Sequence, residues 1–103
     1  GPYRNSDALF EGSPRFALVS GTTLRVFVFD GDDRSVATEV LDAATGETSA
    51  TSTRKLLSRY ESGGTPSLTI EARTPTGLLV SIDSLLQLVP YDPDAKLLRW
   101  PPS

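Results

Sequence analysis

The sequence predicts a single α+β domain in which a mixed sheet of four to five strands packs on one helix. Several short runs alternate apolar and polar residues, as half-buried strands do. Residues 54–60 instead place their apolar side chains at helical spacing. The chain has 103 residues, of which 38% are hydrophobic and 22% are charged, and this suits one folded core. We expect that core within residues 16–92.

The two ends of the chain lie outside the expected domain. We interpret residues 1–15 as a tag remnant, Gly1-Pro2, followed by an N-terminal arm. Residues 93–103 form a proline-rich tail that can dock on the domain. Prolines at this density are unsuited to the middle of a sheet, so we expect at most an edge position for the tail.

Residues 22–29 give the clearest strand pattern. Leu24, Val26 and Val28 alternate to one face. The other face carries phenylalanines, so both faces suit a central strand. Asp30-Gly31 is a strong hairpin signal because glycine accepts a positive φ, and it predicts an antiparallel strand at 35–41. The small polar residues 42–52 then predict an exposed loop.

Residues 54–62 predict the one helix. A hydroxyl residue at 51–53 can cap its first turn, and the leucines and the tyrosine of the segment fall on one side. Gly63-Gly64 and Pro66 supply a stop, since glycine takes the left-handed conformation without a Cβ clash.

Residues 68–91 predict a hairpin and a closing segment. Alternation predicts strands at 68–73 and 78–82, joined by a Thr-Pro-Thr-Gly turn. Residues 83–88 are long enough for about one helical turn. Residues 89–91 can form the closing strand.

Two passages carry a resemblance to a known family. They are the strand and turn LRVFVFDGDD and the run LTIEARTPTGLLVSIDSLLQL. The chain from Leu24 to about Asp92 resembles a divergent doublecortin-type domain, a member of the ubiquitin-like β-grasp superfold. The matched residues are Thr74, Gly77, Ser81, Ile82, Asp83 and Leu85. The resemblance implies a β-grasp fold and microtubule association through a basic surface, whereas this chain has a net charge of −3.

The composition argues against catalysis and metal chemistry. The chain has no histidine and no cysteine, which removes the commonest general base and the commonest transition-metal ligands. The Asp-Gly-Asp-Asp run at 30–33 lacks the ligand spacing of an EF-hand, so we interpret it as a hairpin turn. We expect no catalytic residue, no cofactor and no metal site.

These features favour a non-catalytic protein-interaction or assembly module from a larger cytoskeletal or scaffold protein. The expected location is cytoplasmic, with the cytoskeleton as one option. The predicted partner-binding residues are the basic Arg54, Lys55 and Arg59 and the acidic Asp30, Asp32 and Asp33. Opposite charges on separate faces would permit head-to-tail association, so the partner is a second copy or a cytoskeletal protein. The acidic balance argues against nucleic acid and anionic membranes.

A β-sandwich remains open as the alternative. The run VATEVLDAATGETSATS also fits a strand, a hairpin and a strand, as in an immunoglobulin-like structural module of a cell-surface or secreted protein. Residues 52–62 discriminate the two folds, because a helix there supports the β-grasp and a strand supports the sandwich. Trp100 has two interpretations as well, either an anchor for a partner or a cover for the end of the core.

Overall fold

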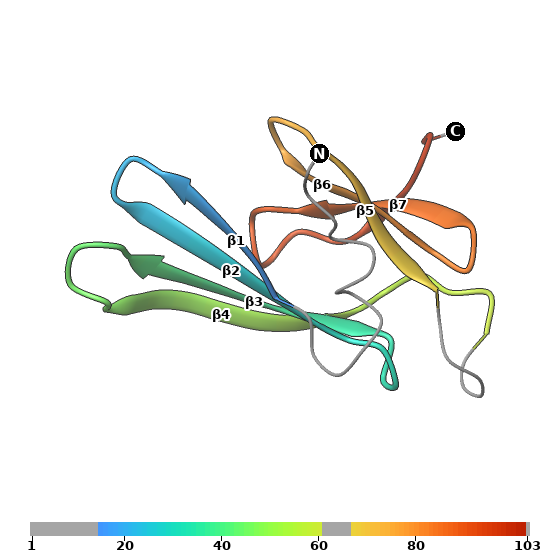
Figure 1. The fold of residues 1–103 in the computed structure, drawn as a ribbon, viewed down its shortest axis with the longest axis horizontal. Coiled ribbons are helices and arrows are strands. Elements are labelled where there is room, and N and C mark those ends of the chain that lie inside the picture. The colour runs from blue at the N-terminus through green and yellow to red at the C-terminus, as the bar shows by residue number, and fades with distance from the viewer. Residues whose placement is uncertain (1–14, 61–66, 103) are drawn as a thin grey trace.

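The structure, a computed structural model, describes residues 15–60 and 67–102. These residues form two antiparallel sheets of four strands each and contain no helix (Figure 1). The first sheet comprises β1 (Arg15–Ser20), β2 (Thr23–Asp30), β3 (Ser35–Asp42) and β4 (Thr48–Lys55). The second comprises β5 (Leu68–Arg73), β6 (Gly77–Ile82), β7 (Leu85–Pro90) and β8 (Leu98–Arg99). The prediction of an α+β fold with one helix packed on the sheet is therefore wrong.

The predicted helix is replaced by β4 and its extended continuation. Arg54 and Lys55 end β4, and the next residue, Leu56, still donates its N–H to the Arg34 carbonyl at 2.8 Å. A short helix gains little from propensity alone, whereas the threonine-rich run before it suits a strand that pairs with β3. The exposed loop predicted at 42–52 is confirmed for residues 43–47, which join β3 to β4, but residues 48–52 belong to β4. The expected stop at 63–66 lies outside the described residues.

The hairpins expected at 30–33 and 74–77 are confirmed. β2 pairs with β3 and β5 pairs with β6, both antiparallel. In the first turn the N–H of Asp33 donates to the Asp30 carboxylate at 3.0 Å. In the second, the Thr74 hydroxyl donates to the Gly77 carbonyl at 2.9 Å.

The helical turn expected at 83–88 is wrong. Ile82 pairs with Leu85, so only two residues connect β6 to β7. Those residues, Asp83 and Ser84, have φ of 51° and 69°. Positive φ at both central positions is the type I′ geometry that matches strand twist. The turn lacks the glycine that usually marks it, and the apolar run after it therefore resembled a helix.

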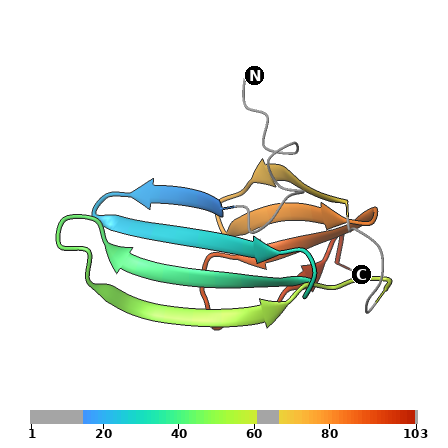
Figure 2. The same ribbon diagram turned by 60° about the horizontal axis from the view of Figure 1, so that its bottom comes forward.

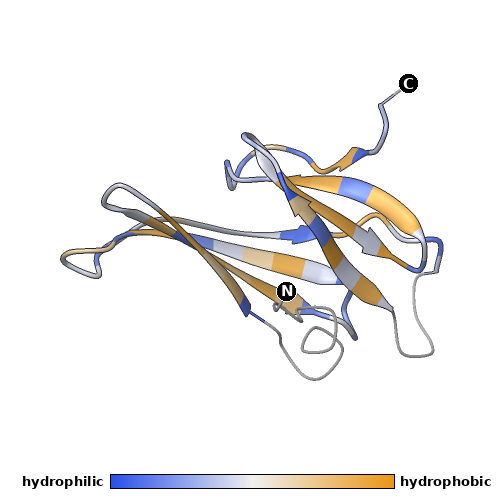
Figure 3. Ribbon diagram, turned by 45° about the horizontal axis from the view of Figure 1, so that its top comes forward, coloured by the Kyte–Doolittle hydropathy of each residue, from blue (hydrophilic) through white to orange (hydrophobic). Residues whose placement is uncertain are grey.

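One hydrophobic core lies between the two sheets. Its buried members come from both, and they are Phe27, Phe29, Val36, Leu56, Leu68, Ile70, Leu78, Val80, Ile82 and Val89. Figure 3 shows the strands of the second sheet largely in the colour of hydrophobic residues. The end of the first sheet that holds the β1–β2 and β3–β4 turns extends beyond the second sheet (Figures 1 and 2). The two-sheet arrangement is that of a β-sandwich.

The sandwich differs from an immunoglobulin domain in its connections. In each sheet the spatial order of the strands is their order along the chain, β1-β2-β3-β4 and β5-β6-β7-β8. An immunoglobulin domain instead exchanges strands between sheets through Greek-key connections. The described strands therefore form two consecutive meanders.

Gln87 attaches the chain after β4 to the second sheet. This side chain is 0% exposed, and its amide makes two hydrogen bonds with the backbone of Leu57. The Leu57 N–H donates to Oε1 at 2.8 Å, and Nε2 donates to the Leu57 carbonyl at 2.8 Å. The amide thus acts toward Leu57 as a neighbouring strand would. Within the described ranges no helix is long and apolar enough to cross a membrane.

Candidate interaction surfaces

The acidic turn and the basic end of β4 adjoin each other. Ser35 at the start of β3 pairs with Lys55 at the end of β4, which brings Lys55 beside the turn at 30–33. The Lys55 ammonium donates to the carbonyl of Asp33 at 2.6 Å and to its Oδ1 at 3.1 Å. The hydrogen bond from Lys55 holds the pKa of the Asp33 carboxyl below its ordinary value. The expected separation of the two charge clusters on different faces is therefore wrong for this pair.

Arg54 points inward from β4 and forms hydrogen bonds with the end of β7 and the chain that follows it. Its guanidinium donates to the carbonyls of Pro90, Asp92 and Ala95 at 3.1, 3.2 and 2.8 Å, and to the Thr38 hydroxyl at 2.8 Å. Burial lowers the pKa of Arg54, and two nearby carboxylates oppose that shift. A planar guanidinium fork suits this many acceptors better than an ammonium would. Arg54 thus has a structural role within the chain.

The other predicted partner-binding residues lie at the surface. Arg59 and Asp32 are exposed, and so is Asp30, whose carboxylate accepts a hydrogen bond within its own turn. The structure brings Asp33 and Lys55 together and assigns Arg54 to an internal contact. Whether any of these six residues binds a partner stays a prediction.

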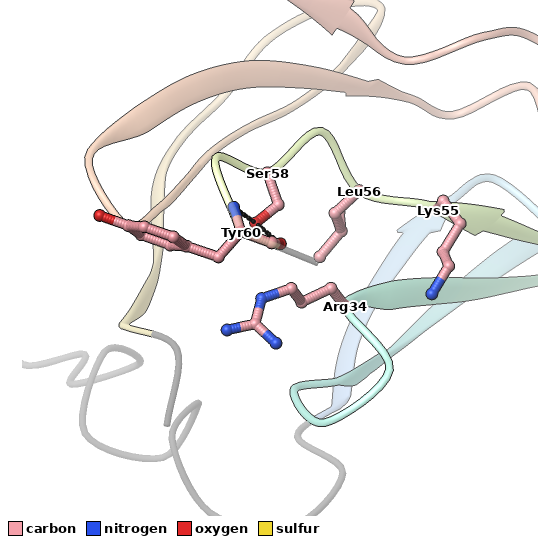
Figure 4. Close-up of a pocket in the computed structure, with 5 residues that line it drawn as sticks. All are labelled: Arg34, Lys55, Leu56, Ser58 and Tyr60. Carbon is pink, nitrogen blue, oxygen red and sulfur yellow. Dashed lines mark hydrogen bonds between the residues drawn. The ribbon is translucent and has the colours of Figure 1, made fainter. Parts of the chain in front are cut away.

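A hollow of about 360 Å³ lies at this corner, lined by Arg34, Lys55, Leu56, Ser58 and Tyr60 (Figure 4). Arg34 is buried, and its guanidinium lies 4.0 Å from the Asp83 carboxylate. The Ser58 hydroxyl donates to the Tyr60 carbonyl at 2.7 Å. Both cations at the hollow therefore face a carboxylate of the chain, and the Ser58 hydroxyl is engaged with the backbone. In the described parts of the chain no group of acidic, histidine or cysteine residues is arranged to hold a metal ion.

An apolar row crosses the outer face of the second sheet. Leu79 pairs with Ala72 on one side and with Leu88 on the other, and Leu88 pairs with Leu98. Residues directly opposite one another in antiparallel strands point to the same face. That face is the outer one, because the neighbours Leu78 and Val89 point into the core. Leu98 ends the row and is 48% exposed.

Trp100 extends the same face. The backbone N–H of Trp100 donates to the Leu86 carbonyl at 3.0 Å, and the β7–β8 register places Trp100 opposite Leu86. The side chain is 39% exposed and does not belong to the residues that pack on the core. Of its two expected roles, covering the core is therefore the one that the structure does not show. We call Leu79, Leu86, Leu88, Leu98 and Trp100 the leucine–tryptophan face.

The sequence contained a signal for this face that the helical interpretation of 83–88 obscured. The run LLQLVP carries apolar side chains at both odd and even positions. Such a run is typical of a strand that is covered on both faces. In the structure the other sheet covers the inner face of β7, and on the outer face Leu88 is 6% exposed and Leu86 is half-buried.

Comparison of the chain with protein-family models, with curated proteins and with solved structures found no match. The resemblance to doublecortin-type domains thus remains an untested expectation. The surfaces themselves are the basis for inferring function.

Replacing Lys55 with methionine should raise the pKa of Asp33 toward its ordinary value of 3.8. Because folding lowers the pKa of Asp33, the contact with Lys55 stabilises the fold fully above the unfolded-state pKa of 3.8. That stabilisation is lost as the pH falls through the lower folded-state pKa. NMR titration of the carboxyl carbons measures the change. Asp42 is the control, because hydrogen bonds from the N–H groups of Thr45 and Ala44 lower its pKa. An unchanged Asp33 titration would show that the contact is absent in solution.

Proposed function

We propose that this chain is a non-catalytic assembly module that associates with a second copy of itself through the leucine–tryptophan face. The single observation that carries the proposal is the exposure of Leu98 and Trp100, at 48% and 39%, beside an apolar row. Clustered exposed apolar side chains mark interaction surfaces, and tryptophan is enriched among the residues that dominate binding energy.

The chemistry of the face favours a second copy as the partner. A two-fold contact places the same patch on both sides, so any charge in its centre would meet itself. The five residues of the leucine–tryptophan face are uncharged, and beside them the Glu71 carboxylate accepts a hydrogen bond from the hydroxyl of Ser81, which pairs with Leu86. An apolar centre without charge is compatible with self-association, since no like charges would meet across the two-fold contact.

The non-catalytic part of the proposal is supported by composition and by the surface hollow. The chain has no histidine or cysteine, and the cations at the hollow of Figure 4 face carboxylates. An activated nucleophile would need a base within hydrogen-bond reach. Ser58 donates its hydroxyl proton to a backbone carbonyl instead.

Sedimentation over a concentration series tests the assembly proposal. The wild-type chain should show a mass that rises with concentration, and the double variant Leu98→Ser, Trp100→Ser should remain a monomer. Val19→Ser is the matched control, since Val19 is 68% exposed on the other sheet. Circular dichroism confirms that each variant is folded. A wild-type chain that stays monomeric, or a control that abolishes association equally, would contradict the proposal.

A further inference from the structure

β4 is the last strand of the first sheet, and no other described strand pairs with its outer side. It pairs only with β3 and contains no proline over its eight residues, Thr48–Lys55. Among the described residues, no backbone hydrogen bond joins this strand to any segment other than β3 and its hairpin. A long edge of this kind presents a row of donors and acceptors that can pair with another strand.

The register identifies the groups that face outward. The Leu56 N–H donates to the Arg34 carbonyl at 2.8 Å, which marks these two residues as a hydrogen-bonded pair. Such pairs alternate along antiparallel strands, so Arg54 and Ser52 direct their backbone groups toward β3. Thr53 and Thr51 then direct their N–H and carbonyl groups away from the sheet.

A groove flanks this edge on each side of the sheet. The outer groove, about 500 Å³, lies over the small Ala37, between the valines Val26 and Val28 and the threonines of β4. The inner groove, also about 500 Å³, lies between β4 and residues 93–97. Successive side chains of a strand point to opposite faces, so a strand added to β4 would send alternate side chains to the two grooves.

We propose that the β4 edge binds an extended segment of another protein by strand addition. Backbone hydrogen bonds to Thr51 and Thr53 hold the segment, and its alternate apolar side chains occupy the outer groove. Glu39 also lines that groove, and the whole chain has a net charge of −3. The segment therefore alternates apolar residues with polar ones and carries a basic residue.

A second copy of β4 is a poor occupant of this site. Its own side chains beside the outer groove, Thr51 and Thr53, are too short to reach across to the hollow over Ala37. Longer apolar side chains are needed to fill it. The site is thus distinct from the leucine–tryptophan face, which lies on the other sheet.

Two peptides of equal composition test the proposal. One alternates leucine and threonine over about eight residues with a lysine at each end, and the other places the leucines consecutively. Fluorescence polarisation of labelled peptides should show at least about tenfold tighter binding of the alternating peptide, since only that order presents its leucines on one side. In hydrogen exchange, the amides of Thr51 and Thr53 should gain protection when it binds.

Three variants locate the binding site. Thr53→Pro removes an N–H that points away from β3 and makes no hydrogen bond to that strand, so it should abolish peptide binding. Thr53→Ser keeps this N–H and should retain peptide binding. Ala37→Leu fills the outer groove and should weaken binding about tenfold while the edge stays intact. Thermal unfolding shows whether each variant folds. If Thr53→Pro does not fold, Ala37→Leu still tests the binding site.

Three results would overturn the proposal. They are equal affinity for the two peptides, unchanged binding by folded Thr53→Pro or Ala37→Leu, and protection at amides outside β4 only. A wild-type dimer that Thr53→Pro dissociates in sedimentation would assign the edge to a second copy instead.

Discussion

Replacing Gly77 with alanine should destabilise the fold by about 3 kcal/mol, because a Cβ at this position has no space. Gly77 pairs with Pro90, and the chain lies so close that a Cβ would be 2.8 Å from the Pro90 Cα and 2.9 Å from the Val89 carbonyl carbon. The Val89 carbonyl oxygen would be closer still. These are backbone atoms, so relief requires β6 and β7 to move apart, and Val89 is a core residue.

The variant Gly46→Ala is the control for Gly77→Ala. Chemical denaturation of both variants separates the steric clash at Gly77 from the general cost of replacing a glycine. Gly46 has a φ of 78°, and apart from its chain neighbours no atom lies within 4 Å of the place that a Cβ would occupy. Gly46→Ala should therefore cost only about 1 kcal/mol, from the left-handed backbone alone. If both variants lose the same stability, the close approach at Gly77 does not constrain the fold.

Replacing Gln87 with leucine should cost about 2 to 3 kcal/mol. The substitution keeps a side chain of similar size in the fully buried position but removes both hydrogen bonds to Leu57. The Leu57 N–H and carbonyl would then lack partners at a half-buried site. Hydrogen exchange should show faster exchange of the Leu57 amide, and denaturation measures the stability.

The variant Gln87→Glu adds a dependence on pH that distinguishes the hydrogen bonds from packing. A neutral carboxyl can accept from the Leu57 N–H and donate to its carbonyl, whereas an ionised one would be buried against that carbonyl. Folding should therefore raise the pKa of the introduced carboxyl. The variant should be most stable below the unfolded-state pKa of about 4.3 and lose stability as the pH rises through the folded-state pKa. A profile parallel to that of wild type would argue that the Leu57 contacts contribute little.

The strands β2, β3, β5 and β6 and two of the turns followed from local pattern. Alternation over 22–29, 68–73 and 78–82 reports which side chains face a core, and this holds whatever covers them. Asp30-Gly31 and the Thr-Pro-Thr-Gly run direct hairpins through the φ preferences of single residues. These parts of the fold depend on neighbours in the chain.

The helix prediction failed because residues 54–60 carry two compatible patterns. Helical spacing and extended pairing both place Leu56 on an apolar side, and the spacing says nothing about the partner strand β3. The buried Gln87 amide then hydrogen-bonds Leu57 in its extended conformation. That contact joins residues far apart in the sequence, so no local window contains it.

The charged residues also show which features depend on local sequence and which depend on the tertiary structure. Their positions in the chain indicated an acidic turn and a basic cluster, but only the β3–β4 register places Lys55 against Asp33 and turns Arg54 inward. The leucine–tryptophan face also depends on pairing, because Leu79, Leu88 and Leu98 come from three different strands.

The sequence by itself determined the strands at 22–29, 35–41, 68–73 and 78–82, the hairpin turns at 30–33 and 74–77, and the absence of histidine and cysteine. The tertiary structure alone decided that residues 48–55 join a sheet, that β7 replaces a helical turn, and which side chains remain outside. The physical reason is that φ preferences and alternation act between neighbours, whereas sheet pairing and burial depend on contacts that the folded chain brings together.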